Sequence, residues 1–397
     1  MIAFLLAPVY FIINTYLFFR IVKWLENFHD SLKKKHFRII LVIVYIFFAI
    51  SMLIAFLLPP GKPRRSMKLI SNYWLGVLMY IVASVMIADL LRLIYLKIRT
   101  PEQRNLCTKN VLAAVGSICA AIVLTTSIWG AGNTRTIRTT NYNIAIPKKV
   151  KNRKELNIVL IADLHLGYNI GCLHMKQMVR KINKQHPDVV VIAGDIFDNE
   201  YEALDYPKKL ASILKGIESK YGVYAVYGNH DIEEKIFAGF TFGGKEKKVS
   251  DPRMDQFLKK ANIHLLMDEA VLIEDSFYLY GRPDYERPGS GIKKRKTPEE
   301  IAKSLDLSKP VIVIDHEPRE LEQLAKAGID MDLCGHTHDG QMFPGNIITS
   351  FLWENSYGYL KIGTMHNIVT SGVGLFGPNI RVGTIAEICP IKVTFKE

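Results

Sequence analysis

The chain has 397 residues, of which 49% are hydrophobic, and it carries a net charge of +13. This length is enough for two or three domains, and the hydrophobic share is high for a wholly soluble protein. The five cysteines form no CxxC pair and are odd in number, which argues against a disulfide framework or a zinc ribbon.

The apolar residues are concentrated in the first 130 residues, where long apolar runs alternate with basic loops. The clearest run, residues 39–58, is bounded by Arg38 and by Pro59-Pro60-Gly61. A run of about 20 apolar residues can cross the hydrocarbon core of a bilayer as a helix. We therefore expect an N-terminal α-helical membrane module over residues 1–130, with four spans near residues 2–19, 39–58, 69–88 and 111–130.

The positive charge gathers in the loops between these runs: six Lys or Arg residues follow the first run, four the second and five the third. Such clusters are better explained by membrane orientation and anionic head groups than by a nucleic-acid backbone, so we expect no nucleic-acid partner. The first and third loops are the more basic pair, and the positive-inside rule places them in the cytoplasm and the soluble domain outside it. The basic second loop and the lysines near residue 150 weigh against this orientation.

Polar residues inside the predicted spans are few. Asp89 lies at the end of the third run and Asn14 lies within the first. An intramembrane carboxylate can mark a transport or sensing function. These two residues are the only support for the alternative that the membrane module is itself a transporter or a sensor.

After the fourth run the pattern changes twice. Residues 131–155 contain Gly, Asn and Thr and then a basic run, and we predict a linker here with room for an edge strand. Over residues 156–397, short β-branched runs first alternate with helical patterns and then dominate. This order predicts an α/β domain in which two packed sheets have helices outside.

A polar block follows each of five predicted strands. The blocks are Asp163-x-His165, Gly194-Asp195, Gly228-Asn229-His230-Asp231, His316 and Gly335-His336-Thr337-His338. Open α/β sheets bind ligands beyond the carboxyl ends of their strands. In an extended segment, the two outer residues of Asp-x-His or His-x-His point to the same side, so each pair is expected to face one site.

The residue types in these blocks predict a metal centre. Carboxylate, imidazole and amide donors together suit borderline divalent ions such as Mn, Fe or Zn better than Ca or Mg. Seven candidate ligands are too many for one tetrahedral ion, so the pattern favours two metal ions. The candidates are Asp163, His165, Asp195, Asn229, His316, His336 and His338.

These five blocks, in this order over residues 158–341, resemble the signature of the calcineurin-like metallophosphoesterase superfamily. The part from Gln341 to Gly372-Val373-Gly374 resembles the bacterial YkuE-like branch, which includes membrane-tethered members and enzymes that act on UDP-diacylglucosamine. The layout is also similar to that of transmembrane proteins with a metallophosphoesterase domain. The resemblance implies a four-layer α/β/β/α metallophosphoesterase sandwich over residues 156–397.

The resemblance also implies a role for each site residue. One metal would be held by Asp163, His165 and His338 and the other by Asn229, His316 and His336, with Asp195 bridging. A metal-bridging hydroxide would attack phosphorus. His230 would protonate the leaving oxygen or stabilise charge in the transition state, with Asp231 orienting its ring. Where this branch commonly has glycine the chain has Asp339, which either crowds an anionic substrate or points into solvent.

Together these features predict a multi-pass, membrane-anchored dinuclear phosphoesterase. Its substrate would be a phosphodiester, a pyrophosphate or a phosphomonoester, and tethering to the membrane favours a lipid-linked or nucleotide-linked one. The alternative is a catalytically silent metal-binding scaffold or sensor with the same fold. Scaffolds of that kind usually lose metal ligands, whereas this chain keeps all seven together with His230.

Overall fold

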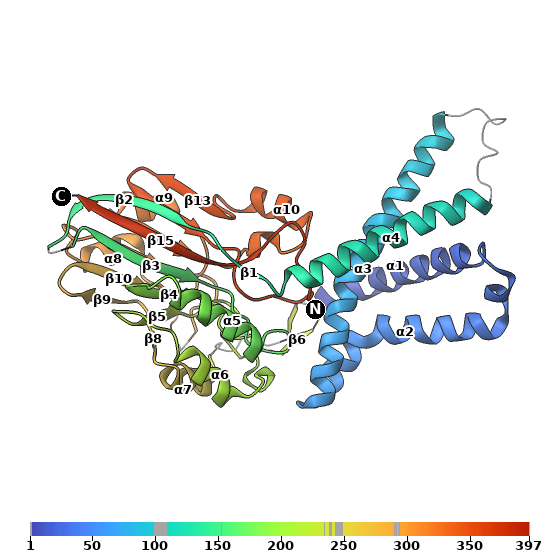
Figure 1. Cartoon of the computed structure of the whole chain (residues 1–397), viewed down its shortest axis with the longest axis horizontal. Helices are drawn as coiled ribbons and strands as arrows, with labels where there is room; N and C mark the ends of the chain where they lie inside the picture. The colour runs from blue at the N-terminus through green and yellow to red at the C-terminus, as the bar shows by residue number, and fades with distance from the viewer. Residues whose placement is uncertain are drawn as a thin grey trace. The chain divides into compact units, whose positions relative to one another are not determined.

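The computed structural model describes residues 2–98, 109–151, 153–233, 235–237, 240–242, 249–289, 292 and 294–396. The chain forms two compact units (Figure 1). The first comprises Met1–Gly132 together with the short segments Ile236–Thr241 and Gly377–Ile380, and the second comprises the remaining residues. The third basic loop lies partly at residues 99–108, outside the described residues.

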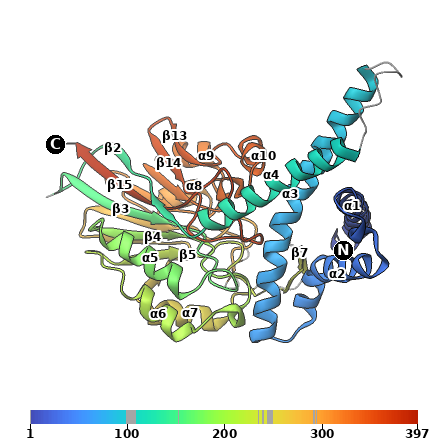
Figure 2. The same cartoon turned by 45° about the vertical axis from the view of Figure 1, so that its right-hand side comes forward.

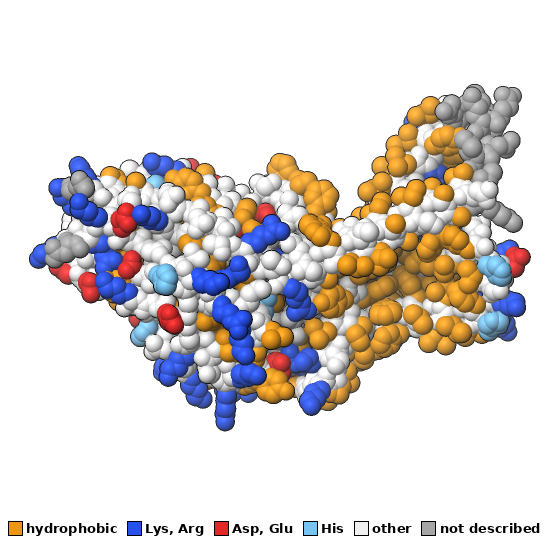
Figure 3. Space-filling view, in the orientation of Figure 1, with side chains coloured by type: hydrophobic (Ala, Val, Ile, Leu, Met, Phe, Trp, Pro, Cys, Tyr) orange, Lys and Arg blue, Asp and Glu red, His pale blue; other side chains and the backbone are white. Residues whose placement is uncertain are grey.

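The first unit is built from long helices. They are α1 (Ile2–Leu25), α2 (Lys35–Leu57), α3 (Lys62–Ile98) and α4 (Lys109–Asn133), with the 3-10 turn η1 (Asp30–Lys33) before α2. In the described part of the chain, α2, α3 and α4 are long and apolar enough to cross a membrane, and hydrophobic side chains cover this unit in Figure 3. A helical N-terminal unit with three candidate membrane spans among the described residues is thus confirmed. The first predicted span, residues 2–19, coincides with α1, and its crossing of the membrane stays a prediction.

Helix α3 is much longer than the predicted span at residues 69–88. Its 37 residues give a length of about 55 Å, whereas the hydrocarbon core is about 30 Å thick. Near its C-terminal end, the carboxylate of Asp89 accepts a hydrogen bond from Arg20 at 2.5 Å and another from the Tyr16 hydroxyl, both on α1. Asp89 therefore has a structural partner, which weakens its reading as a transport residue.

The second unit contains two large sheets. The seven-stranded sheet has the order β1-β15-β3-β4-β5-β8, with β2 paired to β15; its strands are β1 (Ile137–Thr139), β2 (Tyr142–Lys149), β3 (Glu155–Ile161), β4 (Val189–Ala193), β5 (Val223–Val226), β8 (Ile263–Leu265) and β15 (Ala386–Lys396). The six-stranded sheet has the order β13-β14-β12-β11-β10-β9; its strands are β9 (Glu269–Ile273), β10 (Phe277–Gly281), β11 (Val311–Ile314), β12 (Met331–Cys334), β13 (Gly358–Ile362) and β14 (Met365–Val369). A short separate pair consists of β6 (Lys235–Phe237) and β7 (Phe240–Phe242).

The sheets pack against each other, and helices cover their outer faces (Figures 1 and 2). On β3, Ile158 and Leu160 face the core between the sheets, whereas Val159 and Ile161 face the core beneath α5, α6 and α7, because side chains alternate along a strand. The helices are α5 (Cys172–Asn183), α6 (Pro207–Leu214), α7 (Pro252–Lys260), α8 (Pro298–Lys303), α9 (Leu321–Lys326) and α10 (Gly345–Leu352). The α/β fold class is confirmed, and the four-layer count stays a prediction.

Much of the segment predicted as a linker, residues 131–155, belongs to the first sheet. Strands β1 and β2 both pair in parallel with β15 near the C-terminus. Ile144 and Ile146 of β2 are buried in the core between the sheets. An apolar pattern of two alternating isoleucines is too short to identify a strand, and the pairing partner lies about 250 residues further along the chain.

Candidate metal centre

The polar blocks lie at one edge of each sheet. Strands β3, β4 and β5 run parallel to one another, and so do β11 and β12 of the other sheet. Parallel neighbours end at the same edge, so the loops that follow them meet. As the sequence predicts, the side chains that follow these strands lie within hydrogen-bonding distance of one another.

The loop backbones are not extended, contrary to the reasoning applied to the Asp-x-His and His-x-His pairs. Left-handed φ angles occur at Asp163 (52°), His165 (42°), Asp195 (50°), His336 (73°) and His338 (52°). Such angles are uncommon outside glycine and cluster at functional sites. The paired side chains converge because the backbone turns sharply after each strand, and not because of strand alternation.

Two glycines allow the loops to approach this closely. A Cβ atom on Gly228 would lie 2.3 Å from Oδ1 of Asp195, and one on Gly335 would lie 2.6 Å from Oδ2 of Asp163. Real Cβ atoms do not come so near to other heavy atoms. Each glycine therefore makes room for a carboxylate of the site.

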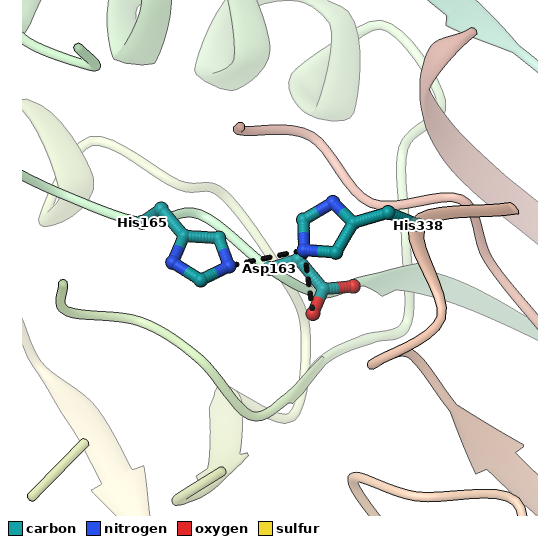
Figure 4. A group of neighbouring side chains, drawn as sticks. All are labelled: Asp163, His165 and His338. Carbon is teal, nitrogen blue, oxygen red and sulfur yellow. Dashed lines mark hydrogen bonds and ion pairs between the residues drawn. The ribbon is translucent and has the colours of Figure 1, made fainter. Parts of the chain in front are cut away.

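Asp163, His165 and His338 form a first group of potential ligands (Figure 4). Nε2 of His338 lies 3.0 Å from Nε2 of His165 and 3.7 Å from Oδ1 of Asp163. All three residues are buried. The backbone N–H of His336 donates to both carboxylate oxygens of Asp163, at 3.1 Å each, and so fixes the orientation of that carboxylate.

A second group lies beside the first. Nε2 of His316 is 3.2 Å from Oδ2 of Asp195 and 3.0 Å from Oδ1 of Asn229. Nδ1 of His336 is 3.0 Å from the same Asn229 oxygen. The other ring nitrogen of His316 lies 2.8 Å from the carbonyl oxygen of Ala193, a contact that holds the imidazole in one orientation, as is usual for metal-ligating histidines.

Asp195 lies between the two groups, because its Oδ2 is also 3.6 Å from Nε2 of His165. The structure thus brings all seven predicted ligands together. In the described part of the chain, two sets of three have their ligand atoms within 4.8 Å of one another: Asp163, His165 and His338, and Asp163, Asp195 and His316. Asp163 belongs to both sets, which the sequence did not indicate.

The residues fit divalent cations in charge as well as in position. Burial, reinforced by the nearby Asp195, raises the pKa of Asp163 to about 6. Burial would also raise the pKa of Asp195, but the charge of His316 outweighs it and holds that pKa well below the usual range. Two carboxylates buried side by side are costly unless a cation neutralises them, and a mixed oxygen and nitrogen donor set suits Mn, Fe or Zn.

His230 stands next to this centre. Its backbone N–H donates to Oδ1 of Asp195 at 2.8 Å, and its ring packs against Phe376 with a centroid distance of 4.5 Å. Its Nδ1 is hydrogen-bonded to Oδ1 of Asn199. Burial lowers the pKa of His230 to about 4, so the ring is neutral near pH 7 unless an anion lies beside it.

Asp231 does not make the ring contact predicted for it. Its two carboxylate oxygens accept hydrogen bonds from the backbone N–H groups of Phe197 and Gly228, each at 2.7 Å. The contact to His230 comes instead from Asn199, in the loop after β4. Sequence reasoning missed Asn199, because its role depends on a contact with His230, which lies 31 residues further along the chain.

Asp339 is half-buried, and it lies outside both ligand sets found among the described residues. Burial raises its pKa to about 6.

Another residue missed by the sequence is Arg381, which is fully buried. Its Nη2 donates to the carbonyl oxygens of Ser371 and Gly374 at 2.7 and 2.9 Å, and these contacts hold the loop that packs against Asp163.

Comparison with known proteins agrees with this geometry. The profile of the calcineurin-like phosphoesterase family matches residues 156–340. An uncharacterised metallophosphoesterase of Aquifex aeolicus is 30% identical over 262 residues, which cover 66% of this chain and 93% of the relative. This chain belongs to the calcineurin-like metallophosphoesterase family. It therefore has a metallophosphoesterase domain.

Two further relatives carry informative names. A transmembrane protein with metallophosphoesterase domain from Danio rerio is 28% identical over 257 residues, which cover 62% of this chain and 55% of the relative. The UDP-2,3-diacylglucosamine pyrophosphatase LpxG of Chlamydia trachomatis is 25% identical over 269 residues, which cover 59% of this chain and 78% of the relative. The chain also spans only 60 to 61% of the length of several other bacterial relatives. Among solved structures, TT1561 of Thermus thermophilus aligns with 54% of this chain at a TM-score of 0.31 and 11% identity, too distant to add to the assignment.

The bonds of Asp231 predict a role in stability. Asp231→Ala leaves the two backbone amides without their acceptor, and each buried unsatisfied donor costs about 1–3 kcal/mol. We expect the midpoint of thermal unfolding to fall by at least about 4 °C, measured by fluorescence on the full chain in detergent. Glu218→Ala, which removes an exposed carboxylate, is the control. Equal midpoints for the two variants would show that Asp231 does not hold the loops.

Proposed function

We propose that this metallophosphoesterase is a membrane-anchored, dinuclear enzyme that hydrolyses a phosphodiester, a pyrophosphate or a phosphomonoester. The observation that carries the proposal is the convergence of seven Asp, Asn and His donors from both sheets on one place, five of them buried, with His230 beside them. When bound, two divalent cations would supply positive charge to the phosphoryl oxygens and acidify a water molecule held between them.

The distances support a division of the ligands. Asp163, His165 and His338 would hold one ion, and Asn229, His316 and His336 would hold the other. Asp195 would contact both ions, because its Oδ2 lies 3.6 Å from His165 on one side and 3.2 Å from His316 on the other. Mn, Fe and Zn are the ions whose preferences this donor set meets.

His230 would act on the leaving group. Its Nδ1 is engaged by Asn199, so Nε2 is the ring nitrogen left for a substrate oxygen. A phosphate anion beside the ring favours its protonated form, and the protonated ring can donate to the leaving oxygen. Asp231 would serve by holding the loops that carry His230 and Asp195.

The substrate class follows from the anchor and from the relatives. The Chlamydia relative is named as a pyrophosphatase of a diacylated sugar nucleotide, and this chain carries apolar helices that can span a membrane. Both features favour a lipid-linked or nucleotide-linked phosphoester. The competing function is a silent scaffold or sensor that binds metal without turnover.

Activity decides between enzyme and scaffold. We expect the full chain in detergent with Mn²⁺ to hydrolyse bis-p-nitrophenyl phosphate, and His230→Ala to lower kcat by roughly 10²- to 10⁴-fold while the metal content is unchanged. His264→Ala, an exposed histidine of β8, should behave as the parent chain does. A fully metallated protein that hydrolyses no diester, monoester or pyrophosphate would leave the scaffold function in place.

The division of the ligands predicts distinct metal losses. His336→Ala and His338→Ala should each retain one ion and lose the other, so that the coupled electron paramagnetic resonance signal of the Mn²⁺ pair is replaced by two different mononuclear signals. Elemental analysis gives the stoichiometry. Loss of both ions in each variant, or the same mononuclear signal in both, would contradict the division.

The charge of the loops leads us to propose that the soluble unit lies outside the cytoplasm. A cysteine replacing the exposed Lys208 should then react with a membrane-impermeant maleimide in intact cells, above the level seen for the parent chain. Reaction only after permeabilisation would place the catalytic unit in the cytoplasm.

A further inference from the structure

Helix α10 presents a large apolar surface beside the metal centre. Four of its side chains are among the most exposed apolar groups of the soluble unit: Ile347 (47% exposed), Ile348 (57%), Phe351 (84%) and Leu352 (71%). Their spacing places them on one side of the helix. We call these four residues the α10 apolar face; hydrophobic side chains gather at the position of α10 in Figure 3.

The surrounding sequence lacks the charges of an ordinary solvent-exposed helix. From Gln341 to Trp353 there is no charged residue, although 22% of the chain is charged, and no residue of α10 is buried. A helix of this kind buries little within its own domain. The α10 apolar face is therefore not explained by folding of the soluble unit.

The same segment is anchored to the site. It follows directly on His338, and the ring of Trp353 at its end lies 5.0 Å from the ring of His336. The Thr337 hydroxyl donates to the carbonyl oxygen of Ser356 at 2.5 Å, closing the segment into a loop. The eight residues of α10 span about 12 Å. Because Trp353 follows α10 and contacts His336, the apolar face lies close to the metal centre.

The residues at the end of α10 are those found where proteins meet lipid head groups. The guanidinium of Arg319 stacks on Trp353 at 4.8 Å and on Tyr285 at 5.2 Å. These residues line a cavity of about 480 Å³ together with Pro318, Glu320, Leu352 and Glu354. Tryptophan, tyrosine and arginine at the edge of an apolar surface are typical of the membrane interface.

The anchor keeps a bilayer within reach. Helix α4 ends at Asn133 and β1 begins at Ile137, so the connecting chain can span at most on the order of 14 Å. A domain tied this closely to a spanning helix meets membrane lipid far more often than it meets any other apolar partner.

We propose that the α10 apolar face is a lipid-contacting surface that inserts into the bilayer interface and holds the metal centre at the boundary between lipid and water. The surface selects phosphoesters carried by membrane lipids. This inference rests on the proposed function for its catalytic consequence, but the contact with lipid can be measured without any activity.

Spin labelling tests the contact directly. Cys107, Cys119 and Cys172 are replaced by alanine, while Cys334 and Cys389 are fully buried and stay unlabelled. A nitroxide is then attached to Phe351→Cys in one full-length chain and to Leu173→Cys in another. Leu173, on α5, is 85% exposed and matches Phe351 at 84%.

In vesicles of phosphatidylcholine and phosphatidylglycerol, position 351 should collide more with lipid-soluble oxygen than with a water-soluble nickel chelate, and position 173 should show the reverse. Equal access of the nickel chelate to both positions would overturn the proposal. Spin–spin broadening at position 351 that disappears on dilution with unlabelled chain would also overturn it, because the face would then bind a second copy.

A second measurement separates this inference from the proposed function. The double variant Ile348→Ser/Phe351→Ser should hydrolyse soluble bis-p-nitrophenyl phosphate at the parental rate. When a nitroxide is attached through Leu352→Cys, the label should lie in lipid in the parent chain and in water in the double variant. If the parent chain hydrolyses the substrate but its label at position 352 already lies in water, the lipid surface is rejected and the proposed function stands. If that label lies in lipid but the parent chain hydrolyses nothing, the proposed function is rejected and the lipid surface stands.

Discussion

The burial of two carboxylates at one point is the constraint on which the soluble unit depends. Asp163 and Asp195 are almost completely shielded from water, and each raises the energy of charging the other. Their charges are met by backbone N–H groups of His336 and His230 and by surrounding imidazoles. Burying these carboxylates costs free energy, which divalent cations at the centre would offset.

Keeping the donors in place requires rigid surroundings, and a network of ions behind His316 supplies them. Arg282 is fully buried and pairs with Asp315 and Glu320, each at 2.7 Å. Arg295 contacts the same two carboxylates at 2.9 and 2.8 Å. Breaking one partner of such a network leaves a buried charge uncompensated, which is strongly destabilising. The network thus fixes the end of β11, where Asp315 immediately precedes His316, a predicted metal ligand.

The sequence predicted the parts of this arrangement that are local. Each predicted metal ligand follows a run such as Val189–Ala193 that is identifiable as a strand by itself, and the types of these residues indicate the chemistry. The sequence could not predict Asn199 or Arg381, because their roles depend on contacts with residues such as His230 and Ser371 in other loops. For the segment that forms β2 the sequence left room for an edge strand, but it could not predict the pairing, because the partner β15 lies at the other end of the chain.

The side chains of His336 and His338 both reach the site, as the His-x-His spacing predicts, but strand alternation is not the cause. His336 and His338 have left-handed backbones, and their rings lie in different ligand groups, next to His316 and His165 respectively. The turn that separates the two rings also starts the segment that leads into α10 and returns at Trp353 to the ring of His336. The two predicted metal ligands and the α10 apolar face are therefore joined by a single stretch of backbone, which returns to the ring of His336.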